Sequence, residues 1–81
     1  MTITTPHNPV TDLNTEGFSP DELKRMNSLY VDIWNDKFSA LDLSDAEAWD
    51  ISSMLWDAIG NSCPSSSLAY DRAERIARNI A

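Results

Sequence analysis

The sequence predicts an all-α protein, a small three-helix up-down-up bundle that follows an extended N-terminal arm. Three observations support this class: two helix-start signatures occur, apolar residues recur at helical spacing, and both glycines fall outside the expected helices. The chain has 81 residues, which provide for a single hydrophobic core. We expect the arm over residues 1–17 and the bundle over residues 18–81, with helices over about 20–38, 45–59 and 68–79.

The two helix-start signatures are capping boxes, in which a serine precedes a glutamate by three residues. Ser19 precedes Glu22, and Ser44 precedes Glu47. The serine hydroxyl accepts a hydrogen bond from the backbone N–H three residues on, and the glutamate carboxylate accepts one from the serine N–H. Pro20 falls at the first helical position, where its missing N–H costs nothing.

The first two helices differ in how much of their surface is apolar. One face of the 20–38 helix collects its large apolar residues: Leu23, Met26, Tyr30, Ile33 and Trp34. The 45–59 helix is apolar over more than half its circumference, which predicts a central position or an additional contact. Gly60 or Asn61 is expected to end this helix in the left-handed conformation.

The last helix has the pattern of an ordinary surface helix. A serine of the loop over residues 62–67 is expected to cap it. Its apolar stripe consists mostly of small residues, which allow close approach to a neighbouring helix: Ala69, Ala73, Ile76, Ala77 and Ile80. Two acid-before-base pairs at i,i+4 are predicted to form ion pairs, Asp71 with Arg75 and Glu74 with Arg78. Short connections favour antiparallel neighbours.

Negative charge is concentrated in the middle of the chain. The protein has 13 acidic and 6 basic residues and a formal net charge of −7. Residues 32–57 hold seven of the acidic residues and a single basic one, Lys37. Such a chain repels nucleic acid and anionic membranes and attracts basic surfaces. We therefore expect a basic protein surface as the partner, with no direct binding of nucleic acid or membrane.

The leading hypothesis is a non-enzymatic interaction module, an inhibitor or adaptor that docks on a basic surface of a partner such as a nucleic-acid-binding protein. The expected docking residues are six aspartates: Asp32, Asp36, Asp42, Asp45, Asp50 and Asp57. Carboxylates one helical turn apart, such as Asp32 and Asp36, lie about 6 Å from each other, near the spacing of phosphates along a strand. Partial mimicry of nucleic acid is one form of this hypothesis. The simpler interpretation is a solvated face that keeps the protein soluble.

Size and charge are also reminiscent of the acidic helical inhibitors that phages and plasmids encode against host nucleic-acid enzymes. No sequence motif carries this analogy. A helix-turn-helix is a further alternative, since Arg72, Arg75 and Arg78 form a ridge on the last helix. The long connection before that helix and the acidic residues between the arginines speak against it.

The main alternative function is a structural or regulatory homodimer. Trp49 and Trp56 lie seven residues apart and extend the apolar arc of the 45–59 helix along one stripe. This stripe exceeds what two neighbouring helices need to cover, so that it could form an apolar seam between two copies.

Catalysis is not expected from this composition. His7 is the single histidine and lies in the arm, and Cys63 precedes Pro64 in a loop with no second histidine to activate it. The sequence lacks metal-ligand spacing and a glycine-rich phosphate loop, so that we expect no metal and no cofactor. A lone cysteine favours the reducing cytoplasm. No segment resembles a signal peptide or reaches membrane-spanning length.

Overall fold

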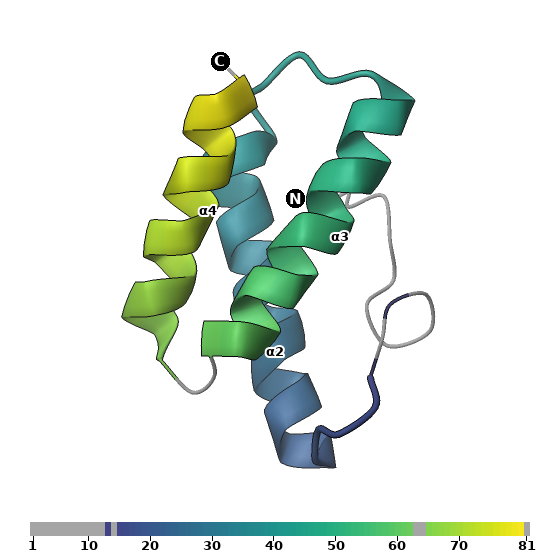
Figure 1. Ribbon diagram of the computed structural model, residues 1–81, viewed down its shortest axis with the longest axis vertical. Helices are drawn as coiled ribbons and strands as arrows, with labels where there is room; N and C mark the ends of the chain where they lie inside the picture. The colour runs from purple at the N-terminus through teal and green to yellow at the C-terminus, as the bar shows by residue number, and fades with distance from the viewer. Residues whose placement is uncertain (1–12, 14, 63–64, 81) are drawn as a thin grey trace.

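Three helices pack together around one core, and the described residues contain no strand (Figure 1). The structure is a computed structural model that describes residues 13, 15–62 and 65–80. Helix α2 covers Pro20–Ile33 and continues as the π-helical turn η1 over Trp34–Phe38; α3 covers Asp45–Ser62, and α4 covers Ser66–Ile80. The predicted N-terminal arm falls largely outside the described residues, as do His7 and Cys63.

Both predicted capping boxes are present and set the starts of α2 and α3. The Glu22 N–H donates to the Ser19 hydroxyl over 3.2 Å, and the Ser19 N–H donates to the Glu22 carboxylate over 3.1 Å. The Ser44 and Glu47 pair repeats these two distances. These hydrogen bonds lower the pKa of both glutamates, because they stabilise the carboxylate form. The start of α4 is capped by Ser65, whose hydroxyl accepts from the Leu68 N–H.

The end of the first helical segment is a π-helix, which the apolar spacing did not predict. The Ser39 N–H donates to the Trp34 carbonyl over 2.9 Å, five residues back. Despite the wider turn, Trp34 and Phe38 are both buried, and their ring centroids lie 5.3 Å apart. The predicted extent of this segment, to residue 38, therefore holds when η1 is included.

The core is built from large side chains of α2, η1 and α3 and from small side chains of α4. Its buried apolar members are Met26, Tyr30, Ile33, Trp34, Phe38, Ile51, Leu55, Trp56, Ile59, Ala69 and Ala73. The predicted small-residue stripe of α4 thus supplies two fully covered alanines. This allows α4 to lie close to α3, its most extensive neighbour, while it also contacts α2 and η1.

Gly60 corrects a prediction about the end of α3. It lies inside the helix, which continues to Ser62, and the one described glycine with positive φ is Gly17. A Cβ at Gly60 would meet the Phe18 ring at 3.0 Å and the Met26 methyl group at 3.5 Å. Close packing against the first segment, and not helix termination, therefore explains the absence of a side chain here.

Within the described residues, none of the helices combines the length and apolar character needed to cross a membrane.

Candidate interaction surface

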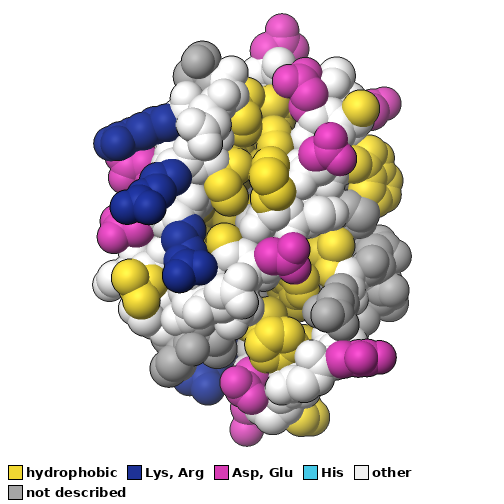
Figure 2. Space-filling view, in the orientation of Figure 1, with side chains coloured by type: hydrophobic (Ala, Val, Ile, Leu, Met, Phe, Trp, Pro, Cys, Tyr) yellow, Lys and Arg dark blue, Asp and Glu magenta, His cyan; other side chains and the backbone are white. Residues whose placement is uncertain are grey.

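All six aspartates predicted to bind a partner are solvent-exposed. Asp32 lies in α2, Asp36 in η1 and Asp42 in the loop that follows, and α3 carries the remaining three, Asp45, Asp50 and Asp57. Figure 2 shows acidic side chains over α3 and the end of the molecule where α3 begins, and a row of Lys and Arg side chains along α4. On this side of the molecule α3 therefore presents acidic side chains without cations, whereas α4 presents cations with acidic side chains beside them.

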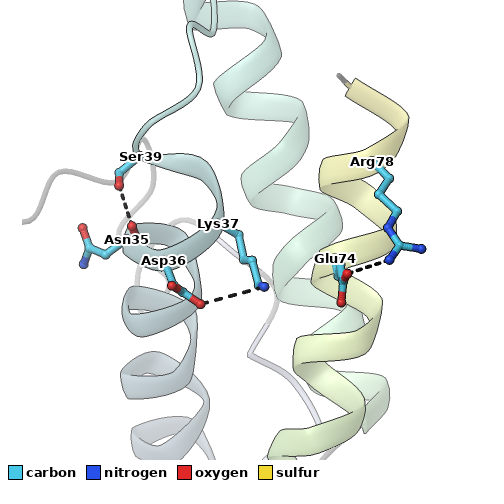
Figure 3. A network of polar contacts seen from close by, with 6 residues as sticks. All are labelled: Asn35, Asp36, Lys37, Ser39, Glu74 and Arg78. Atoms are coloured by element: carbon cyan, nitrogen blue, oxygen red, sulfur yellow. Dashed lines mark hydrogen bonds and ion pairs between the residues drawn. The ribbon is translucent and has the colours of Figure 1, made fainter.

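Few of these carboxylates are neutralised by ion pairs. Of the six, Asp36 alone forms an ion pair in the described part of the chain, to Lys37 at 4.0 Å (Figure 3). The other ion pair among the described residues joins Glu74 to Arg78 at 2.7 Å, as predicted, whereas the predicted pair between Asp71 and Arg75 does not form. Within the described residues, ion pairs therefore offset little of the acidic charge of residues 32–57.

The aspartates come from different elements, and two pairs can be distinguished. Asp32 and Asp36, which we term the α2 pair, lie near enough to Tyr70, a half-buried residue of α4, for their charges to act on its phenol. Burial is the larger cause that raises the pKa of Tyr70, and the two carboxylates add to it by disfavouring the phenolate.

Asp50 and Asp57, which we term the α3 pair, lie on the outer side of α3. Asp50 lies about 140° and Asp57 about 160° around the helix from the fully buried Leu55. The six predicted docking residues therefore come from α2, η1, α3 and the loop before α3.

The two tryptophans of α3 differ in exposure, although their spacing places them on one stripe of the helix. Trp56 is 2% exposed and packs edge-to-face on Tyr30, with ring centroids 5.9 Å apart. Trp49 is 45% exposed. The core of the single chain therefore already covers Trp56, and of this pair only Trp49 can provide a substantial apolar contact with another molecule.

Three features of the surface escaped sequence reasoning. The apolar side chains of Met54 and Leu68 are 47% and 50% exposed. An open groove of about 540 Å³ between α2 and the start of α4 brings Lys24 and Arg25 beside Ser66. No signal in the sequence could have placed these cations beside the start of α4, because Ser66 is about 40 residues away along the chain.

The described residues contain no group of three or more His, Cys, Asp or Glu side chains placed to hold a metal ion. What they offer another molecule is charge, a few exposed apolar side chains and shallow grooves. No protein-family model matches this chain, and neither the curated proteins nor the solved structures compared with it give a match.

Proposed function

We propose that this protein is a non-enzymatic interaction module that docks on a basic surface of a partner protein and thereby inhibits or tethers it. One observation carries the proposal: residues 32–57 hold seven acidic residues against Lys37 alone, and the six aspartates among them are exposed. Of these six aspartates, Asp36 alone has its charge offset by an ion pair within the described residues. Carboxylates in this state attract a basic surface over several ångströms and speed its association.

The partner that best fits this chemistry is a protein that itself binds nucleic acid. Such proteins present rows of Lys and Arg, and the α2 pair offers carboxylates one turn apart near the spacing of phosphates. If the carboxylates mimic phosphates in this way, the protein would inhibit a host nucleic-acid enzyme, as the inhibitors encoded by phages and plasmids do. We also propose that the helices follow an up-down-up order, that residues 1–17 form an extended arm, and that the protein acts in the cytoplasm.

Comparative capture from a lysate of the native host tests this function. The bait with Asp32, Asp36, Asp50 and Asp57 reversed to lysine should lose the partner that the unchanged protein captures. Each position is exposed, so that each reversal should alter the free energy of unfolding by no more than about 0.5 kcal/mol.

The matched control bait carries Arg72, Arg75 and Arg78 reversed to glutamate and should retain the partner. Separate reversal of the α2 pair and of the α3 pair then shows which group binds. Loss of the partner by the arginine bait, with retention by the aspartate bait, would place binding on α4 and refute the proposal.

Trp49 supports a second candidate function, a structural or regulatory homodimer in which the acidic residues serve solubility. A tryptophan that is 45% exposed on a surface helix is the type of residue that anchors an interface. In that case Trp49→Ala should abolish self-association, and reversal of the aspartates should not.

A further inference from the structure

The side of the molecule where α3 packs on α4 combines apolar and charged residues in a regular way. On α3, Met54 lies one turn from Asp50 and one turn from Asp57, so that an exposed apolar side chain stands between two carboxylates. On α4, Leu68 lies one turn before Arg72, and Arg75 follows at the next turn. We call these six residues, Asp50, Met54, Asp57, Leu68, Arg72 and Arg75, the α3–α4 face.

This face is acidic along one edge and basic along the other. In Figure 2, Lys and Arg side chains follow α4, Asp and Glu side chains lie over α3 and its beginning, and apolar atoms lie between; further acidic side chains lie beside the cations of α4. In the described part of the chain the charged members of the face form no ion pair. Among the described residues, no opposite charge therefore pairs with them.

A surface with this arrangement is complementary to itself in one orientation. When a second copy faces the first across a two-fold axis parallel to α3 and α4, its basic edge lies over the acidic edge of the first, and the converse holds at the other edge. A two-fold axis across the helices would place arginines on arginines and aspartates on aspartates, which costs several kcal/mol. Charge therefore selects a single symmetric arrangement.

The positions along the helices agree with this arrangement. The C-terminal end of α4 lies at the same end of the molecule as the beginning of α3 (Figure 1). A two-fold axis along the helices preserves height, so that Arg72 of one copy meets Asp57 of the other at a similar level. In this arrangement Arg75 of one copy faces the part of α3 that carries Asp50 in the other copy. The exposed Met54 and Leu68 of both copies then lie within the contact.

We infer that a second copy of this chain covers the α3–α4 face, in a two-fold dimer in which Arg72 and Arg75 of each copy pair with Asp50 and Asp57 of the other. The inference does not depend on the proposed function. It differs from the dimer through Trp49, because Trp49 lies on another side of α3, about 140° from Met54. It leaves the α2 pair open to a basic partner.

The oligomeric state measured by sedimentation equilibrium over a wide concentration range tests the inference. The unchanged protein should give the mass of a dimer at high concentration. Variants with Arg72→Glu and Arg75→Glu, or with Asp50→Lys and Asp57→Lys, should each raise the dimer dissociation constant by at least about tenfold. A control with Lys24→Glu and Arg25→Glu changes the net charge by the same amount as the arginine variant and should dimerise like the parent protein.

Two restorations make the test specific for this geometry. The protein with all four reversals combined should dimerise again, because the edges have exchanged sign together. An equal mixture of the arginine variant and the aspartate variant should form a heterodimer, since every facing pair is then of opposite sign.

The neutral changes Met54→Gln and Leu68→Gln should also weaken the dimer, and Trp49→Gln should not. Far-UV circular dichroism verifies that each variant is folded. If the charge-reversal variant of the arginines does not fold, the neutral variant with Arg72→Gln and Arg75→Gln takes its place. A monomer at every concentration, a failure of both restorations, or loss of the dimer through Trp49→Gln would overturn the inference.

Discussion

Replacing Trp56 by alanine tests whether Trp56 belongs to the core while Trp49, on the same helix α3, lies at the surface. A fully covered tryptophan buries about 150–250 Å², and its edge-to-face contact with Tyr30 adds about 0.5–1.5 kcal/mol. Large-to-small changes of this kind cost about 3–5 kcal/mol, including the cavity that remains. A chain of 81 residues has a free energy of unfolding of roughly 4–12 kcal/mol. Trp56→Ala should therefore remove a large part of the free energy of unfolding, and it should unfold the protein if the parent lies near the low end of this range.

Urea denaturation followed by circular dichroism measures this effect. Trp56→Phe, which keeps a ring against Tyr30, should lower the free energy of unfolding by about 1–2 kcal/mol and give a complete transition. Trp49→Ala is the matched control on the same helix, and its partial exposure limits the expected loss to about 2 kcal/mol. If Trp49→Ala destabilises the protein as much as Trp56→Ala, the assignment of Trp56 to the core and Trp49 to the surface is wrong.

Three other results follow from the caps and from Tyr70. Ser19→Ala and Ser44→Ala should each lower the free energy of unfolding by about 1 kcal/mol, and unchanged denaturation midpoints would contradict the observed helix starts. The glutamates of both capping boxes have folded-state pKa values below the ordinary 4.5, so that their stabilisation is present at neutral pH and is lost as the pH falls through the folded-state pKa. Changing both glutamates to glutamine should flatten this acid-side dependence in thermal denaturation. The phenol of Tyr70 should titrate above its usual pKa of 10.0, and the double change Asp32→Asn with Asp36→Asn should lower this pKa in an NMR titration. An unchanged pKa of Tyr70 would show that the α2 pair does not act on α4.

Local features of the helices were predictable from the sequence because they depend on residues close together in the chain. The capping boxes need only a serine, a glutamate and a spacing of three. The buried face of α2 follows from helical periodicity and was predicted correctly for Met26, Tyr30 and Ile33. The contact between Glu74 and Arg78 is likewise local.

Apart from the local pair of Asp71 and Arg75, which does not form, the main errors occur where contacts between helices decide the outcome. A glycine near the end of an apolar run usually stops a helix, but at Gly60 the proximity of the Phe18 ring explains the residue and α3 continues. The spacing of Trp49 and Trp56 places them on one stripe, yet only the position of Tyr30 and its neighbours determines that Trp56 is covered.

The candidate surface shows the same limit. The sequence identified which aspartates carry the excess charge, and they are exposed. It could not show that Asp32 and Asp36 lie beside Tyr70, or that Lys24 and Arg25 lie beside the start of α4. These arrangements depend on how the three helices pack and are not encoded in any single segment.

The salt dependence of the affinity for the captured basic partner tests the central claim most directly. Isothermal titration calorimetry from about 0.05 M to about 0.5 M sodium chloride should show the dissociation constant rising by at least about tenfold, because salt screens attraction between exposed charges. The protein with the four reversed aspartates should show no binding at any of these concentrations. A dissociation constant that stays constant across this range, or equal binding by the reversed protein, would contradict docking through the acidic residues.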